Sequence, residues 1–260
     1  MPPNAIDLNS DVGESFGNYT LGLDEEVIPL ISSANIACGY HAGDPAVMRR
    51  TVALAKQNGV GLGAHPGLPD LVGFGRRNMD VTLEEIKDFV TYQIGALQAV
   101  AARQGARLQH IKPHGALYNM AVKNTDIWDA VAEVMAGLDE RLILFVLAGS
   151  DRRDLEAIGR RRGSRIAFEF FADRAYHTDG SLVSRKQPGA VIHDNDVAAA
   201  KVLKLVKEGT VKTIEGSEIG LKAETICVHG DNPKALSLVK KIRETLGAAG
   251  VAVKPVAIFL

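Results

Sequence analysis

Short hydrophobic runs with strand character alternate with amphipathic helical stretches along the whole chain, and this alternation constrains the fold more than any other feature. Several of the runs are almost continuously apolar, which is typical of parallel strands that helices cover in a layered sheet or around a barrel. The predicted strands are residues 5–8, 33–38, 60–64, 109–113, 142–148, 165–171 and 225–229.

Helix boundary signals lie between these strands. Asp44 followed by Pro45 predicts an N-cap with proline in the first turn, and Gly59 predicts the end of that helix. Thr82 and Glu85 have the spacing of a capping box at the start of another helix. Further predicted helices cover residues 126–137, 151–162 and 196–208, and one more follows the Asn232-Pro233 pair.

Seven β/α steps without a linker or an internal repeat predict one catalytic domain over residues 1–260. We expect an α/β fold, an irregular seven-stranded β/α barrel. An open doubly wound sheet is the alternative, because sequence does not reveal strand order. Residues 67–79 and 173–194 form long loops, which predict lids or binding loops, or else surfaces of an oligomer.

Net charge, hydrophobic runs and cysteine content indicate the compartment of the protein and the partners that it is not expected to bind. A formal net charge of −1 gives no electrostatic reason to expect nucleic acid or a membrane surface. No apolar run is long enough for a bilayer, and the N-terminus lacks signal-peptide features. Cys38 and Cys227 predict free buried thiols, with Cys38 as an alternative nucleophile because His41 is near in sequence. We therefore expect a cytoplasmic protein.

Polar side chains collect where the predicted strands end. In parallel β/α folds these ends converge on one face, where such folds place their active sites. Single residues have structural explanations, such as helix caps, but polar groups after six strands predict an active site. The candidates are Asn9, Asp11, Glu14, Asn35, His41, His65, Lys112, His114, Arg174, Arg185 and Asp231.

Lys112 and His114 are two residues apart, so both point to one side of a strand. A neighbouring ammonium keeps an imidazole neutral, and the pKa of the lysine can itself be lowered. The pair predicts a general base and an electrostatic clamp for an oxyanion or phosphate. Alternatively, Asp11, His65 and His114 suit a divalent metal ion, although ligands from separate strands follow no spacing rule.

Two common catalytic motifs are absent from the sequence. There is no G-x-x-x-x-G-K-[ST] phosphate loop, so we do not expect this chain to bind ATP alone. There is no G-x-S-x-G elbow, which argues against a serine hydrolase of the α/β type.

Seven sequence blocks, in order along the chain, resemble the LamB/YcsF family. The blocks are DLNSDVGESFG (7–17), NIACGYHAGDP (35–45), GAHPGLPDLVGFGRR (63–77), IKPHGALYN (111–119), FADRAY (171–176), DGSLVSR (179–185) and VHGDNP (228–233).

The resemblance implies a fold similar to the glycoside hydrolase/deacetylase superfamily. Members of the family open the lactam of 5-oxo-L-proline to L-glutamate with ATP, as 5-oxoprolinases that include partner subunits B and C. It implies that the partners bind ATP and activate the lactam, and that a chain like this one completes ring opening. Related YdjC-like deacetylases bind metal through residues equivalent to Asp11, His65 and His114, but they carry a second aspartate where this chain has Val12.

These expectations give a hypothesis for the site. Asp11 or His114 acts as base, and Lys112 and His65 stabilise charge. The residues expected to bind substrate are Asn9, Glu14, Asn35, His41, Arg174, Arg185 and Asp231, with the two arginines on its carboxylate or phosphate. The rival hypotheses are a stand-alone metal-dependent amidohydrolase or deacetylase, and a non-catalytic subunit that binds a small ligand.

Overall fold

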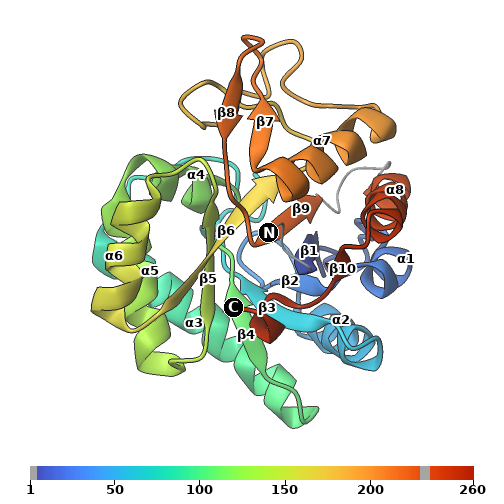
Figure 1. Cartoon of the computed structure of the whole chain (residues 1–260). Helices are drawn as coiled ribbons and strands as arrows, with labels where there is room; N and C mark the ends of the chain where they lie inside the picture. The colour runs from blue at the N-terminus through green and yellow to red at the C-terminus, as the bar shows by residue number, and fades with distance from the viewer. Residues whose placement is uncertain (1–4, 229–234) are drawn as a thin grey trace.

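The computed structural model describes residues 5–228 and 235–260, and it confirms the α/β barrel. Seven parallel strands form a closed ring, because β1 pairs with β2 on one side and with β9 on the other (Figure 1). This closure excludes the open doubly wound sheet. In ring order the strands are β1 (Ala5–Val12), β2 (Ser33–Ala37), β3 (Gly61–His65), β4 (Leu108–Ile111), β5 (Ile143–Leu147), β6 (Arg165–Phe171) and β9 (Thr225–Val228).

Helices surround this ring (Figure 1). They are α1 (Asp24–Val27), α2 (Pro45–Gln57), α3 (Leu83–Arg103), α4 (Gly115–Lys123), α5 (Thr125–Leu138), α6 (Arg152–Arg162), α7 (Asn195–Glu208) and α8 (Ala235–Ala248). The short elements are η1 (Ile28–Leu30), β7 (Thr210–Lys212), β8 (Glu218–Gly220), β10 (Ala252–Val253) and η2 (Val256–Ile258). In the part of the chain that the structure describes, no helix combines the length and the apolar character needed to cross a membrane.

Local capping explains where two helices begin. The Asp44 carboxylate accepts hydrogen bonds from the backbone N–H groups of Ala46 and Val47, both at 2.8 Å. The Thr82 hydroxyl accepts from the Glu85 backbone N–H, and the Glu85 carboxylate accepts from the Thr82 backbone N–H. Both predicted caps are confirmed, because these side chains pair N–H groups that a first helical turn leaves unpaired. The predicted Asn232-Pro233 cap lies outside the described residues.

The long segment 173–194 folds back on itself and contacts the connection between β7 and β8. Isolated antiparallel bridges join Arg174 to Val191 and Tyr176 to Leu182, and the Ile214 N–H donates to the Tyr176 carbonyl at 2.9 Å. Figure 1 shows the antiparallel β7–β8 hairpin at the same end of the molecule as α7. The sequence pattern did not predict this hairpin, because its strands are three residues each and too short for a periodic signal.

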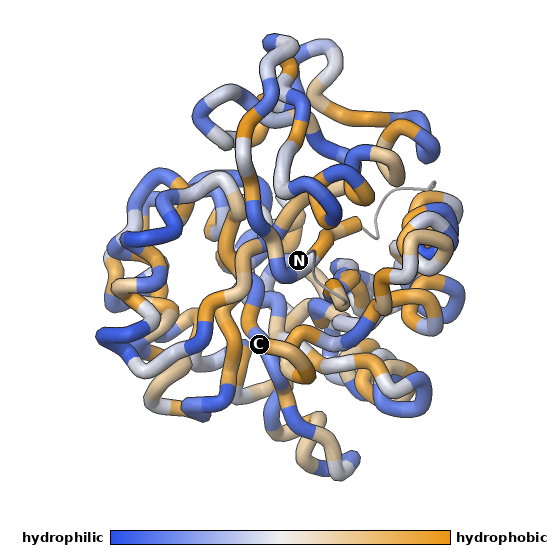
Figure 2. The backbone as a smooth tube through the Cα atoms, in the orientation of Figure 1, coloured by the Kyte–Doolittle hydropathy of each residue, from blue (hydrophilic) through white to orange (hydrophobic). Residues whose placement is uncertain are grey.

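The apolar core has two parts. The larger cluster lies between the strands and the helices, and Figure 2 shows hydrophobic stretches along the strands and mixed stretches along the outer helices. A second cluster joins Ile143, Phe145, Ala167 and Val256, which come from β5, β6 and η2. Because Phe145 also stacks on the buried ring of His110 at 4.2 Å, this cluster borders polar residues of the barrel interior.

Much of the barrel interior is polar. Asp7 on β1 accepts hydrogen bonds from Ser33 on β2 at 2.6 Å, from Thr225 on β9 at 2.5 Å, and from Ser32 just before β2 at 2.6 Å. Asn9, two residues further along β1, donates to Thr225 at 2.7 Å. Side chains alternate along a strand, so this face of β1 leads towards its carboxyl end through Asp11.

Small residues on β3 make room for wide side chains on β4. A Cβ atom added at Gly63 would lie 2.0 Å from the His110 ring, and one added at Gly61 would lie 2.0 Å from the Gln109 amide. The pairing of β3 with β4 also shifts its register between Leu62 and Gly63. We infer that these glycines allow the polar β4 side chains to lie inside the barrel.

The buried carboxyl of Asp7 predicts a measurable pH dependence of stability. Burial raises its pKa from 3.8 to about 6, against the effect of its hydroxyl partners. The folded protein therefore keeps a proton that the unfolded chain releases, so stability falls as pH rises from about 4 through 6. We expect Asp7→Asn to remove the Asp7 contribution to this decline, up to about 3 kcal/mol in the unfolding free energy. A smaller decline should remain, because burial also raises the pKa of Asp24 to about 6.

Urea unfolding at several pH values between 4 and 8 measures the effect. Asp88→Asn, a substitution of an exposed aspartate on α3, is the matched control and should retain the decline. A decline of the same size in Asp7→Asn and in the unsubstituted protein would contradict this assignment.

Candidate active site

A pocket of about 180 Å³ opens at the carboxyl ends of the barrel strands. Its walls come from β1, β3, β6, the turn after β4, α4 and the two long loops. The lining residues are Asp11, Glu14, His65, Arg76, Lys112, Pro113, His114, Gly115, Tyr118, Asn119, Phe171, Arg174, Leu182 and Arg185. This is the position expected for the active site of a β/α barrel.

Lys112 is the central charge of the pocket floor, with only 2% of its surface exposed. Its ammonium group lies 2.8 Å from the Asp11 carboxylate on β1 and 3.0 Å from the Glu169 carboxylate on β6. It also donates to the Cys227 sulfur on β9 at 3.0 Å. Asn35 on β2 donates to the same Asp11 oxygen at 2.8 Å. Side chains from three barrel strands therefore contact this lysine, and a fourth strand supports one of them through Asn35.

These neighbours keep Lys112 charged. Burial alone would lower the pKa of its ammonium, but the nearby carboxylates of Asp11 and Glu169 outweigh burial and hold the pKa well above its ordinary value. The expectation that the pKa of Lys112 can be lowered is therefore wrong. Lys112 is suited to stabilise negative charge rather than to accept a proton.

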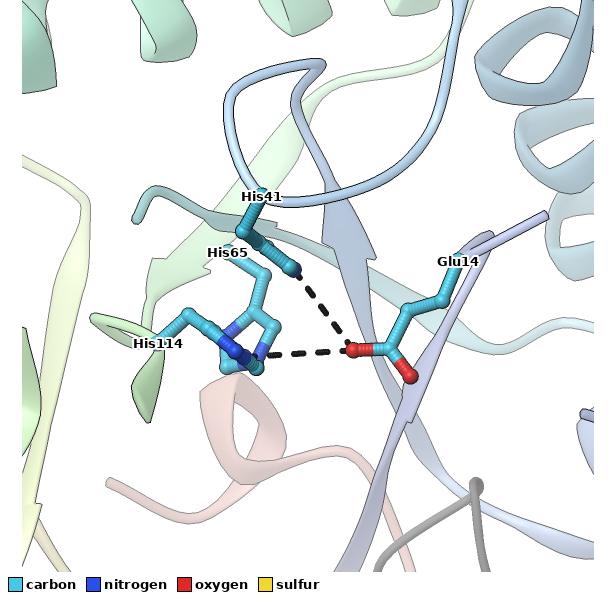
Figure 3. A group of neighbouring side chains, drawn as sticks. All are labelled: Glu14, His41, His65 and His114. Atoms are coloured by element: carbon cyan, nitrogen blue, oxygen red, sulfur yellow. Dashed lines mark hydrogen bonds and ion pairs between the residues drawn. The ribbon is translucent and has the colours of Figure 1, made fainter. Parts of the chain in front are cut away.

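Three histidines and Glu14 form a compact cluster above this floor (Figure 3). His41 comes from the loop after β2, His65 ends β3, and His114 precedes α4. The His41 and His114 rings stack in parallel with centroids 3.7 Å apart. His65 Nε2 lies 2.9 Å from His114 Nδ1, and Glu14 lies 3.5 Å from His41 Nε2 and 3.8 Å from His114 Nδ1.

The cluster favours neutral imidazoles. Burial, followed by the nearby His65, lowers the pKa of His114 to about 3. Burial, followed by His114 and His65, lowers the pKa of His41 well below its ordinary value. His114 is therefore neutral at pH 7, as the sequence predicted, although burial and His65 rather than Lys112 are the main causes. A neutral imidazole can act as a base or as a metal ligand.

The pocket brings together most of the residues proposed from the sequence. The pocket-lining members of that set are Asp11, Glu14, His65, Lys112, His114, Arg174 and Arg185. Asn9 and Asn35 lie beneath it, where Asn35 donates to Asn9 at 2.7 Å, and His41 stacks behind His114. Asp231 lies outside the described residues. The roles assigned to these residues stay predictions.

Sequence reasoning missed several contributors. Glu169 was expected among the polar residues at the end of its strand but was given no role, and Cys227 was expected only as a buried thiol, yet both contact Lys112. Arg76 and Tyr118 line the pocket from the loop after β3 and from α4. The same loop also contacts the cluster through its backbone, since the Phe74 carbonyl accepts from His114 Nε2 at 2.8 Å, and side-chain patterns give no signal for such a contact.

Both cysteines are free and buried, as predicted. Burial raises the pKa of the Cys38 thiol to about 12, and that thiol contacts the Ile36 carbonyl at 3.1 Å. A thiol with this pKa is a poor nucleophile, so the alternative role for Cys38 loses its support.

Comparison with known proteins places this site in a family. A model of the LamB/YcsF family matches residues 6–260. The chain belongs to the LamB/YcsF family. Within this LamB/YcsF chain, Asp11, Glu14, His41, His65, Lys112 and His114 all fall inside the matched range.

Two curated proteins that are similar to this chain over nearly its whole length are both A subunits of 5-oxoprolinase. The chain is 54% identical over 251 residues to the A subunit of 5-oxoprolinase from Bacillus licheniformis, covering 96% of this chain and 98% of that protein. It is 56% identical over 255 residues to the A subunit of 5-oxoprolinase from Pyrococcus furiosus, covering 98% and 99%. Among solved structures, the lactam utilization protein from Thermus thermophilus matches with a TM-score of 0.90 and 44% identity, covering 96% and 99%.

The ion network around Lys112 predicts a large stability effect. Replacement of Lys112 by Met would leave Asp11 and Glu169 buried without their cation, which costs about 3–5 kcal/mol of unfolding free energy. Urea unfolding at pH 7 measures this loss. Lys123→Met, at an exposed lysine on α4, is the matched control and should change stability by less than about 0.5 kcal/mol.

A triple variant separates charge from packing. Adding Asp11→Asn and Glu169→Gln to Lys112→Met removes the two uncompensated charges, so part of the lost stability should return. If Lys112→Met alone unfolds like the unsubstituted protein, the ion network does not have the role given to it here.

Proposed function

We propose that this chain acts as the A subunit of an ATP-dependent 5-oxoprolinase and opens the lactam of 5-oxo-L-proline to L-glutamate. One observation carries the proposal: a charged lysine, a carboxylate and a neutral histidine border one small cavity, in a chain more than half identical to curated 5-oxoprolinase subunits. The name of these relatives also indicates an assembly of more than one kind of subunit.

The size of the pocket supports a small substrate. A volume of about 180 Å³ is below the ~300–1,000 Å³ typical of sites for drug-sized ligands. Such a space suits a single small ring better than a sugar polymer or a peptide. Arg174 and Arg185 border the same space and suit the carboxylate of a cyclic amino acid.

ATP enters the proposal through partner subunits B and C. A lactam carbonyl is a weak electrophile, and the sequence of this chain has no phosphate loop. In the proposed division of labour, the partners bind ATP and phosphorylate the lactam oxygen. Water then attacks the activated ring carbon in this chain, the ring C–N bond breaks, and the nitrogen takes up a proton. The product of this step is an acyl phosphate, and its hydrolysis by a second water releases phosphate and L-glutamate.

The residues of the pocket have distinct proposed roles. Lys112 stabilises the negative charge that develops on oxygen, because it stays protonated in a buried site. Asp11 or His114 removes the proton from water, and His65 stabilises charge beside them. Asn9 and Asn35 support this arrangement indirectly, since the Asn35 amide donates hydrogen bonds to both Asp11 and Asn9. A cytoplasmic location agrees with an ATP-dependent reaction and stays a prediction.

A second candidate function follows from the histidine cluster. Glu14, His41, His65 and His114 could hold a metal ion, so a stand-alone metal-dependent amidohydrolase is the alternative. The metal set predicted from the sequence included Asp11, whose Oδ2 lies 3.5 Å from His65 Nε2. Asp11 is engaged by Lys112, which makes Glu14 and His41 the better partners for His65 and His114.

Reconstitution tests the proposed function. With subunits B and C, ATP and 5-oxo-L-proline, we expect glutamate formation, and omission of any one of the three subunits should abolish it. Asp11→Ala or Lys112→Ala should lower the rate by at least about 100-fold, because each removes a group that acts on the reacting atoms. ATP-dependent activation of the lactam by the partners should survive in both variants.

Lys123→Ala is the control variant and should support normal turnover, since Lys123 is exposed on α4. Full turnover with Asp11→Ala or Lys112→Ala would refute the catalytic assignment. Altered affinity with unchanged turnover would instead favour the non-catalytic binding role, and activity without ATP or partners would favour the amidohydrolase.

A further inference from the structure

Two histidines of the cluster point acceptor nitrogens at each other. His65 Nδ1 lies 2.6 Å from the Lys112 carbonyl, and His114 Nε2 lies 2.8 Å from the Phe74 carbonyl. A carbonyl oxygen only accepts, so both of these ring nitrogens must carry the proton. In neutral rings the remaining nitrogens, His65 Nε2 and His114 Nδ1, then face each other with lone pairs at 2.9 Å.

Such a contact is repulsive unless a cation lies between the two nitrogens. A proton between the nitrogens would turn one of the rings into a charged imidazolium. That charge would be unfavourable here, because His65 and His114 are only 1% and 4% exposed and the charged Lys112 is nearby. A metal ion bound by both lone pairs removes the repulsion. Donation of the second ring nitrogen to a backbone carbonyl is also the arrangement that commonly orients metal-binding histidines.

His41 provides an independent observation. Its side chain is buried, and neither ring nitrogen has a hydrogen-bond partner among the described residues. Its Nε2 atom faces Glu14 at 3.5 Å (Figure 3). A buried ring nitrogen without a hydrogen bond is costly, and coordination to a metal would satisfy it.

The spacing of the four ligand atoms suits one ion. The ligand atoms of Glu14, His41, His65 and His114 all lie within 4.8 Å of one another, and three of the pairs are 2.9, 3.5 and 3.8 Å apart. A tetrahedral Zn²⁺ site with bonds of ~2.0–2.1 Å has ligand atoms about 3.3 Å apart. These three distances bracket this value, so small side-chain movements would complete the shell.

We propose that Glu14, His41, His65 and His114 bind one divalent transition-metal ion of the Zn²⁺ type. Three nitrogen ligands and one carboxylate favour such an ion over Mg²⁺ or Ca²⁺, which prefer oxygen. Glu14, His65 and His114 also line the pocket, so the ion borders the substrate space. One consequence rests on the proposed function: with His114 bound to metal, Asp11 remains as the base.

Metal titration of this chain alone tests the proposal. After removal of metal with a chelator, we expect isothermal titration calorimetry to give one Zn²⁺ per chain, and Co²⁺ to give the visible spectrum of a nitrogen-rich site. Glu14→Gln and His41→Ala should each weaken Zn²⁺ binding at least about 100-fold, since each removes a ligand. His193→Ala, at an exposed histidine outside the cluster, should bind as the unsubstituted protein does.

Circular dichroism distinguishes the loss of a metal ligand from misfolding of the variant. Circular dichroism of each variant without metal should match the unsubstituted protein, and only proteins with an intact cluster should gain thermal stability from Zn²⁺. Failure of the unsubstituted protein to bind Zn²⁺ or Co²⁺, or equal binding by the Glu14→Gln and His41→Ala variants, would overturn the proposal. Neither lactam nor ATP is present, so failure here is distinguishable from failure of the oxoprolinase proposal.

Discussion

The buried ammonium of Lys112 is the interaction on which the rest of the site depends. It draws Asp11 from β1, Glu169 from β6 and Cys227 from β9 to one point at the end of the barrel. An ammonium group in this position is unfavourable unless carboxylates surround it, and those carboxylates are unfavourable without it. The ammonium and the two carboxylates therefore stabilise one another, and their contacts hold β1 and β6 against the residue that follows β4.

The backbone of the same lysine orients the histidine cluster. Its carbonyl contacts His65 Nδ1, while the Phe74 carbonyl fixes His114 from the loop after β3. The side chain and the carbonyl of one residue thus connect the charged floor with the imidazoles above it. This connection explains how a small pocket can present a fixed cation, a carboxylate and neutral nitrogens to one ligand, which is the combination that ring opening of an activated lactam needs.

Sequence patterns predicted the parts of the fold that depend on local interactions. The caps at Asp44 and Thr82 could be read from neighbouring residues, because the hydrogen bonds that form them span two or three positions. The seven apolar runs gave the barrel strands, with boundaries that differ by up to four residues. Helix α4 was missed because it begins directly at the pocket, where Gly115 and the polar residues around it interrupt the helical pattern.

The site was less predictable, since its contacts join residues that are far apart in the sequence. Asp11 and Lys112 were identified from their places at strand ends, but their direct ion pair spans 101 positions. Glu169 stood out only as one more polar residue at a strand end and Cys227 only as a buried thiol, so neither contact with Lys112 could be predicted. The choice between Asp11 and Glu14 as partners of the histidines depends on which carboxylate Lys112 engages, and spacing along the chain carries no information about that contact.

A crystal structure of this chain with 5-oxo-L-proline bound would show directly whether the Lys112 pocket holds the substrate. We expect the ring in the pocket between Lys112 and His114, with its carboxylate towards Arg174 or Arg185. The larger cavity between residues 15–26 and α2 should contain no ordered ligand. Substrate density in that second cavity, with the Lys112 pocket unchanged, would contradict the account.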